Sequence, residues 1–283
     1  MSYLDHIRHC NNADPAGYRP MRIGGATVGH VRHDLAQRLA AWPDVFQMGA
    51  AAIDLHPRLD SVDARSDAVE GVLGQLNEEG LILGWRGETY PVAPRWGAEP
   101  LMRIERAACP LLGIRAWGVH MNGYVRRADG IHMWIGRRAK DKPTYPGMLD
   151  NMVAGGQPLG LGLRENLIKE AGEEANIPPA LAARATAVGA ISYRHALADG
   201  LKPDEMFCFD LELPEGFVPR NTDGEIESFR LMPVAEVARI VRDTAEFKFN
   251  CNLVIIDFLI RHGLLDPDAE PDYGALCAGL HAG

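Results

Sequence analysis

Cysteine is scarce in this chain of 283 residues. The five cysteines are scattered and no two of them form a CxxC pair; they are Cys10, Cys109, Cys208, Cys251 and Cys277. This spacing argues against a disulfide framework and against a structural zinc site. We therefore expect each cysteine to be a small buried side chain, and we expect the protein to work in a reducing cytoplasm.

Long hydrophobic runs and an excess of positive charge are also missing. No apolar run reaches the roughly 18 residues that span a membrane, and residues 1–15 mix charges without the apolar centre of a signal peptide. The formal net charge is −9, from 38 acidic and 29 basic residues, which weighs against nucleic-acid polymers and anionic membranes as partners. Apolar residues make up 47% and charged residues 24%, as in an ordinary folded protein, and the length predicts two domains.

The first predicted domain is an N-terminal α/β accessory domain over residues 1–112. Its pattern predicts a hairpin in 22–33, a strand in 45–55 and two strands in 81–94, and a connecting helix follows near 105–113. Two helices are predicted at 33–42 and 66–80, the second with Ser66 as its N-cap and Gly80 just after its end. No chemical motif marks this domain. Closing over a substrate, forming a homodimer and stabilising the fold remain alternative roles for it.

The second predicted domain covers residues 113–265 and is followed by a C-terminal tail, 266–283. Two runs rich in aromatic and β-branched residues flank Ala128-Asp129-Gly130, which is typical of a hairpin. The other predicted elements are strands in 186–197, 205–214 and 227–233 and helices in 234–243 and 249–265. Strands with helices between them indicate a mixed α/β (α+β) layer fold.

Three glutamates crowd into the predicted helix at 163–176. At 100° per residue, with Glu170 at zero, Glu173 and Glu174 fall at about −60° and +40°, beside the apolar stripe instead of opposite to it. Lys169, at about −100°, is expected to point away from them. Carboxylates beside a core are costly unless a cation neutralises them, and Mg²⁺ suits an all-oxygen site. Periodicity alone leaves a metal site and a solvated helix face as equal alternatives.

The segment 155–177 resembles the Nudix box, G-x5-E-x7-R-E-U-x-E-E-x-G-U, where U is a bulky aliphatic residue. Gly155 takes the first glycine position, and the register then continues through Glu170, Ala171, Glu173, Glu174 and Ile177. The resemblance implies that Glu170, Glu173 and Glu174 are catalytic and hold Mg²⁺ or Mn²⁺, together with the backbone carbonyl near Gly155. It also implies an α/β/α sandwich around a mixed sheet.

Three positions depart from the box. Leu161 stands in place of its first glutamate, Lys169 in place of its arginine and Asn176 in place of its last glycine. Because all three metal-binding glutamates are present, we interpret the departures as the mark of a subfamily. The same segment is not a P-loop, since no Gly-Lys-Ser/Thr follows its glycines.

The surrounding sequence is similar to one branch of the Nudix hydrolases. The similar segments are 118–125, 133–156, 168–178, 223–232 and 252–263. This branch includes the Nudix half of fungal thiamin pyrophosphokinases and related plant and bacterial proteins with an extra N-terminal domain. The resemblance implies hydrolysis of thiamin diphosphate or its oxidised, oxo-thiamin analogues to the monophosphate.

Further site residues are expected around the box. Glu225, favoured over Glu227, is the candidate for a distal acid that assists catalysis, with a plain surface carboxylate as the alternative. Four basic residues precede the box and are candidates to neutralise the diphosphate: Arg137, Arg138, Lys140 and Lys142. For the ring of the substrate the candidates are Tyr145 and Trp134, which would stack on it, and His120 and Asn122, which would line its pocket; His120 and Trp134 have core positions as their alternatives.

Two other functions stay open. A nucleoside diphosphate compound, such as ADP-ribose or an oxidised nucleotide, would need the same chemistry and a different pocket. A non-catalytic Nudix ligand-binding module is the second alternative, and the complete set of three glutamates weighs against it. Under each reading the partner is a small-molecule diphosphate.

Overall fold

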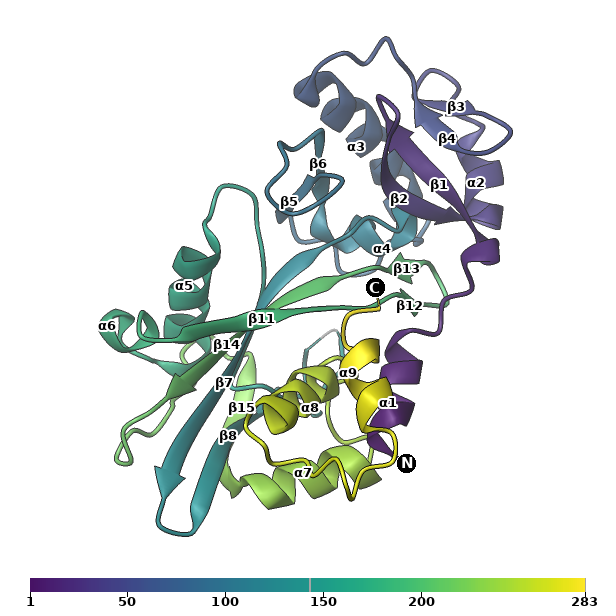
Figure 1. Cartoon of the computed structure of the whole chain (residues 1–283). Helices are drawn as coiled ribbons and strands as arrows, with labels where there is room; N and C mark the ends of the chain where they lie inside the picture. Colours follow the sequence, from purple (N-terminus) through teal and green to yellow (C-terminus); the bar gives the residue numbers. More distant parts are fainter. Residues whose placement is uncertain (143, 283) are drawn as a thin grey trace.

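The computed structural model describes residues 1–142 and 144–282 and has two units, which Figure 1 shows joined near α4 (Cys109–Leu112) and β13 (Leu201–Lys202). In the first unit a four-stranded sheet has the order β2-β1-β4-β3. Its strands are β1 (Tyr18–Ile23), β2 (Ala26–Arg32), β3 (Phe46–Met48) and β4 (Ile53–Leu55). The β1–β2 hairpin turns at Gly24 and Gly25, as the sequence predicts.

The helices α2 (His33–Leu39) and α3 (Val62–Glu78) cover this sheet, and β5 (Thr89–Val92) pairs with β6 (Met102–Glu105) beside it. Short 3-10 turns lie at η1 (Pro15–Gly17) and η2 (Arg106–Ala108). The buried side chains of the first unit form one core, whose residues lie between Met21 and Ile114.

The second unit is built on a seven-stranded mixed sheet. Its main path is β11-β14-β7-β8-β15, with β10 added to β7 and β9 added to β8. The strands are β7 (Trp117–Arg127), β8 (Gly130–Arg138), β9 (Leu149–Asp150), β10 (Val153–Gly156), β11 (Thr186–Ser192), β14 (Glu205–Glu212) and β15 (Ile226–Pro233). Only the β14–β7 pair is parallel among these described ladders. A separate two-stranded ladder joins β12 (His195–Ala196) to β13.

Helices pack on both faces of this sheet. On one face lie α5 (Leu163–Ala175) and α6 (Pro179–Ala182), whose apolar side chains share a core with Val119 and Met121 of β7. On the other face lie α7 (Val234–Asp243), α8 (Cys251–Arg261), α9 (Tyr273–Gly279) and α1 (Tyr3–Cys10) (Figure 1). Side chains alternate between the two faces along β7, which produces two cores. The predicted α/β/α sandwich is confirmed.

The first helix packs with the second unit. Tyr3, Leu4 and Ile7 are buried in the same core as α8, and the Tyr3 hydroxyl donates to the Ala238 carbonyl at 3.0 Å. A capping box between Ser2 and Asp5 starts this helix. Figure 1 shows α1 beside α9, so both ends of the chain lie against the same face of the large sheet.

Three details of the first unit differ from the sequence prediction. The strand predicted at 45–55 is two strands, because Gly49 and Ala52 close a turn with a 2.9 Å backbone hydrogen bond. The helix predicted from Ser66 begins a turn earlier, with Ser61 as its N-cap; Ser66 lies inside it and donates to Val62. In place of two strands in 81–94 there is only β5, since its partner β6 lies further along the chain.

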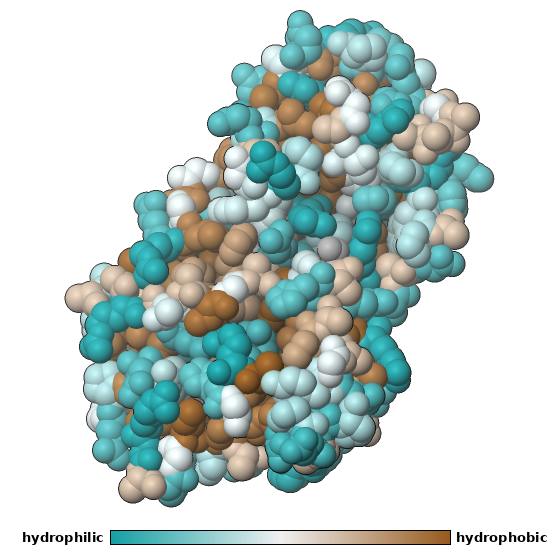
Figure 2. Space-filling view, viewed as in Figure 1, coloured by the Kyte–Doolittle hydropathy of each residue, from teal (hydrophilic) through white to brown (hydrophobic). Residues whose placement is uncertain are grey.

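Figure 2 shows this face of the molecule with hydrophilic residues along most of the outline of both units and hydrophobic residues grouped further in. No helix within residues 1–142 and 144–282 has the length and apolar character that crossing a lipid bilayer requires.

Candidate functional site

Glu174 ties the last turns of α5 to strand β10. Its carboxylate accepts a hydrogen bond from the backbone amide of Ala154 at 2.8 Å, and the residue is only 5% exposed. Burial raises the pKa of this carboxyl well above its ordinary value, the neighbouring Asp150 and Glu170 raise it further, and the Ala154 amide opposes them. The Ala154 amide therefore does not offset the cost of burying this negative charge.

Glu170 lies one helical turn earlier and packs against the glycine of the box. A Cβ built on Gly155 would overlap its side chain and come within 2.7 Å of Oε2, so only glycine leaves room for this carboxylate. Burial raises the pKa of Glu170, and the charge of Lys169 works against that rise. The carboxylate and the backbone of β10 are thus held side by side.

Lys169 bridges two of the glutamates. Its ammonium donates to Glu170 at 3.1 Å and to Glu173 at 2.7 Å. The expectation that Lys169 points away is wrong, because the positions of residues 169 and 173 are only about 40° apart on the wheel and the long lysine stem spans that gap. Arg164 of the same helix donates to the backbone carbonyls of Ala183 and Ala185.

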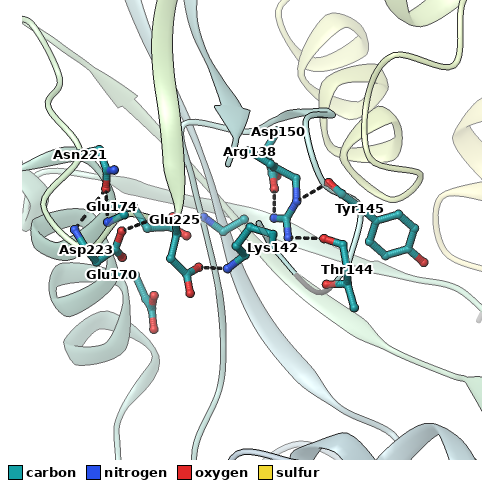
Figure 3. A network of polar contacts seen from close by, with 12 residues as sticks. Arg138, Lys142, Thr144, Tyr145, Asp150, Glu170, Glu174, Asn221, Asp223 and Glu225 are labelled. Carbon is teal, nitrogen blue, oxygen red and sulfur yellow. Dashed lines mark hydrogen bonds and ion pairs between the residues drawn. The ribbon is translucent and has the colours of Figure 1, made fainter. Parts of the chain in front are cut away.

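A distal loop brings Glu225 to the same place (Figure 3). The loop is fixed to the end of α5, where the Thr222 hydroxyl donates to the Glu173 carbonyl at 2.5 Å and the Arg220 amide donates to the Ala175 carbonyl. Within the loop, Asn221 accepts from the amides of Asp223 and Gly224, and Asp223 accepts from the Glu225 amide at 2.8 Å. This turn presents Glu225 toward Glu170 and Glu174.

Lys142 forms an ion pair with the Glu225 carboxylate. Burial raises the pKa of Glu225, but the hydrogen bond and charge of Lys142, followed by the charges of Arg86 and Arg106, bring the pKa below its ordinary value. In Figure 3 Lys142 lies between the carboxylates and the Arg138 cluster. The site therefore has two kinds of acid: Glu170 and Glu174 with raised pKa values, and Glu225 with a lowered one.

The donor set fits a hard divalent cation. Within residues 1–142 and 144–282, no three His, Cys, Asp or Glu side chains are arranged as a complete metal site. Here the ammonium groups of Lys142 and Lys169 neutralise Glu225, Glu170 and Glu173. Among the residues that the structure describes, Glu174 receives only the backbone amide of Ala154. Carboxylate oxygens beside the Gly155 carbonyl are the ligands that Mg²⁺ accepts while it keeps positions for water and phosphate.

Comparison with known proteins identifies the family. The chain is 44% identical over 279 residues to Nudix hydrolase 20, chloroplastic, from Arabidopsis thaliana, covering 95% of this chain and 75% of that protein. It is also 44% identical over 285 residues to Nudix hydrolase 24, chloroplastic, of the same plant, covering 99% of this chain and 78% of that protein. The chain belongs to the Nudix hydrolase family.

The first unit of this Nudix hydrolase matches a separate family model, described as a domain of unknown function, DUF4743, over residues 2–116. Among solved structures, the Nudix domain of Shewanella oneidensis NrtR complexed with ADP ribose is similar, with 13% identity and a TM-score of 0.41 over 53% of this chain and 89% of that one. The predictions of the Nudix family, of a hydrolase and of a diphosphate linkage as its target are confirmed at this level.

The three departures from the Nudix box have structural counterparts. Asn176 has φ +52° at the end of α5, a left-handed conformation that asparagine tolerates better than most residues other than glycine. Lys169 pairs with the glutamates of its own helix. Leu161 is partly exposed in the loop before α5, where it lines a pocket together with Trp96 and Gln157.

The four basic candidates occupy different surroundings. Lys142 contacts the carboxylate group, whereas Lys140 is 82% exposed and lies 3.9 Å from Glu227. Arg138 is buried and donates to Asp150 at 2.7 Å and to the carbonyls of Thr144 and Tyr145 (Figure 3). Arg137 donates to the Gly147 carbonyl. The two arginines hold the loop before the box, and Lys142 is the basic candidate nearest to the glutamates.

Three of the four candidates for ring binding are buried, and Tyr145 is partly buried. His120 and Asn122 belong to a buried polar network with Asn151, in which His120 Nδ1 is 2.9 Å from Asn151 Oδ1. Burial, and after it the charge of Lys248, lowers the pKa of His120 to about 4. Tyr145 packs with its ring 5.4 Å from that of Phe249, and Trp134 is 7% exposed within a core. These side chains already have partners within the protein fold, apart from the unpaired Trp134 indole N–H.

Two residues of the first unit reach the box and were not anticipated from the sequence. A Cβ on Gly156 would overlap the Tyr90 hydroxyl and would lie 3.5 Å from Cζ of Arg106. Arg106 also forms an ion pair with Glu88 at 2.8 Å, and its positive charge helps to lower the pKa of Glu225. The second glycine of the Gly155-Gly156 pair was the one sequence signal, since it indicates that another segment packs closely against this backbone. Nothing in the sequence shows that this segment carries Tyr90 and Arg106.

Proposed function

We propose that this Nudix hydrolase is a Mg²⁺-dependent pyrophosphohydrolase that converts thiamin diphosphate, or its oxidised oxo-thiamin analogue, to the monophosphate. The observation that carries the metal part is the pair of carboxylates against β10, the buried Glu174 and the partly buried Glu170. Their raised pKa values indicate a deficit of positive charge that a divalent cation would fill. The resemblance of segments such as 133–156 to the thiamin pyrophosphokinase branch supports the substrate.

Glu170, Glu174 and the Gly155 carbonyl would hold the cation, with Glu173 at the exposed edge; Mn²⁺ would substitute for Mg²⁺. When bound, such a cation neutralises the anionic oxygens that make a diphosphate resist attack by water. Glu225 is a carboxylate with a lowered pKa and a partly exposed side chain. It would stay ionised at neutral pH and orient the attacking water by accepting a hydrogen bond.

Lys142 and Arg106 would bind the diphosphate oxygens. Both contribute positive charge at Glu225, from opposite units of the protein. In the reaction the water oxygen bonds to the terminal phosphorus and the bridging P–O bond breaks. The products are the monophosphate and inorganic phosphate, with release of a proton that Glu225 or solvent takes up.

The test is turnover of a panel of diphosphates by the full chain with Mg²⁺, read by mass spectrometry. The panel contains thiamin diphosphate, oxo-thiamin diphosphate, ADP-ribose, NADH and 8-oxo-dGTP. We expect conversion of a thiamin compound to its monophosphate, and loss of this conversion in Glu174→Gln and with EDTA. Turnover of a nucleotide alone would overturn the substrate and keep the chemistry. Tight binding without turnover of any compound would favour a non-catalytic module.

A further inference from the structure

A pocket lies between the first unit and the loop that leads into α5. One wall is formed by Pro91 of β5 and by the segment that follows this strand, with Trp96, and the other by the loop 157–161 of the Nudix box. Trp117, at the start of β7, closes its base. The Leu159 amide donates to the Thr89 carbonyl at 3.1 Å, which fixes the two walls to each other. The pocket is therefore a built junction of the two units.

Aromatic and apolar side chains make this pocket suitable for a flat ring. Trp96 lies with its ring centroid 5.6 Å from that of Trp117 and 4.9 Å from that of Phe207, in tilted contacts that fix the position of its ring. Leu159 and Leu161 add apolar surface. Leu161 occupies the position where the general box has glutamate, and a carboxylate there would charge the wall. Among the described residues that line the pocket, Arg95 is the only charged one, which favours an uncharged ring.

Gln157 contributes a polar side chain whose hydrogen bonds are incomplete. The residue is 1% exposed, and its Nε2 donates to the Leu161 carbonyl at 2.7 Å. Its Oε1 is buried and has no hydrogen-bond partner within residues 1–142 and 144–282. Buried amide oxygens are normally paired, so the side chain of Gln157, which lines the pocket, favours a ligand that brings an N–H donor.

The size of the pocket limits its occupant. Its volume is about 180 Å³, which corresponds to roughly six water molecules at about 30 Å³ each. Pockets for drug-sized ligands have about 300–1,000 Å³. This volume matches one substituted heteroaromatic ring better than a complete purine nucleoside.

The pocket also lies beside the proposed metal site. Gln157 follows Gly155 and Gly156 directly in the chain, so its Cα is within about 7 Å of that of Gly155. A ring held next to Gln157 and a diphosphate held next to Gly155 and Glu170 would belong to one molecule of modest length. One continuous stretch of the box would thus bind both the ring and the diphosphate of a substrate.

We propose that this pocket binds the heteroaromatic end of the diphosphate substrate, as a single uncharged ring that stacks on Trp96 and donates an N–H to Gln157. The proposal rests on the proposed function and narrows it, because it selects substrates that end in one small ring, such as the terminal aminopyrimidine of thiamin, over purine nucleotides. It also gives the first unit a role in choosing the substrate.

The first test is binding of thiamin, which has an aminopyrimidine ring and no phosphate, to the full chain by isothermal titration calorimetry. We expect saturable binding that weakens about tenfold or more in Trp96→Leu, as the loss of one base–aromatic stack predicts. Leu161→Glu, a change at a partly exposed position, should weaken it similarly. Trp42→Leu is the matched control, since Trp42 packs against the core of the first unit and does not line the pocket. Equal binding by all four proteins, no binding of thiamin, or tighter binding of adenosine would overturn the proposal.

The second test compares kcat/KM for thiamin diphosphate with that for methyl diphosphate, which lacks a ring. The ratio should fall about tenfold in Trp96→Leu and in Leu161→Glu and stay unchanged in Trp42→Leu. If the natural chain hydrolyses both compounds and the variants keep its ratio, the pocket proposal fails and the proposed function stands. If the natural chain binds thiamin through Trp96 but hydrolyses no diphosphate, the proposed function fails and the pocket stands.

Discussion

The Glu174 carboxylate accepts the Ala154 amide hydrogen at 2.8 Å, so the Nudix helix is joined to strand β10 by an acid buried in the interior. An isolated buried carboxylate is costly, and its raised pKa expresses that cost. The buried charge therefore lowers the stability of the fold, and it belongs to the proposed cation site. The first prediction measures the effect of Glu174 on stability and its effect on activity separately.

Glu174→Gln should lower kcat about 100-fold or more while it raises the thermal stability of the metal-free protein. The amide side chain keeps an oxygen for the Ala154 amide and removes the buried charge, and the loss of activity follows from the loss of a proposed metal ligand. Differential scanning fluorimetry with and without Mg²⁺ checks both effects. Mg²⁺ should raise the melting temperature of the natural chain and not that of the variant. Glu165→Gln, on an exposed position of the same helix, should behave like the natural chain; a metal-free Glu174→Gln protein that melts lower would contradict this account.

Gly155→Ala should reduce activity about tenfold or more, because the new methyl group overlaps Glu170 and displaces its carboxylate. Gly172→Ala is a matched substitution in the same box. Its Cβ would meet open space inside α5, so it should leave activity unchanged and stabilise the fold by about 0.5–1 kcal/mol. Steady-state kinetics and urea unfolding of both variants provide the measurement. Equal activity in the two variants would show that Gly155 is not needed for the position of Glu170.

The position of the glutamates on the helix wheel was predictable, because it depends only on helical geometry. The wheel put the three glutamates beside the apolar stripe instead of opposite to it. The structure has Glu174 buried, the Glu170 side chain 16% exposed and the Glu173 side chain 48% exposed. The hairpin of β7 and β8 was predictable for a similar local reason, since its turn and its strand pattern lie in one short segment.

Contacts between distant segments were not predictable in this way. Nothing periodic links Tyr90 and Arg106 to Gly156, and their meeting depends on how two units pack. The pairing of Lys169 was missed because the wheel describes where a side chain starts and ignores how far a lysine reaches. The N-cap of α3 was assigned to Ser66 instead of Ser61, because both serines stand before apolar positions of the same helix and only the backbone decides between them.

Acid should destabilise the fold through His120. Its pKa is lowered to about 4 in the folded protein by burial, whereas an unfolded histidine has a pKa of about 6.5. The unfolded chain therefore binds more protons between these values, so the stability from neutral His120 is complete above pH 6.5 and is lost as pH falls toward 4. This predicts a loss of about 2 kcal/mol between pH 7 and pH 5 from this residue.

Urea unfolding of the natural chain and of His120→Gln at the two pH values checks this prediction. Glutamine keeps an N–H donor for Asn151 and does not titrate, so the variant should lose about 2 kcal/mol less between pH 7 and pH 5. The comparison between the two proteins removes the contribution of other groups. Glu174 and Asp257, with raised pKa values, act in the opposite direction in both. Identical pH dependence in the two proteins would mean that His120 titrates normally.

Arg106→Met should raise KM for the diphosphate about tenfold and change kcat little. Arg106 comes from the first unit, lies beside Gly156 and adds positive charge at Glu225, and a charge-assisted hydrogen bond to phosphate is worth about 1.5–3 kcal/mol. Methionine keeps the length of the side chain and removes its charge. Arg103→Met is the matched control, because Arg103 forms a similar partly exposed ion pair with Asp63 on α3. Kinetics at constant ionic strength should then show a raised KM in the first variant and none in the second. If both variants keep the natural KM and lose only stability, the first unit supports the fold at this point and takes no part in binding phosphate.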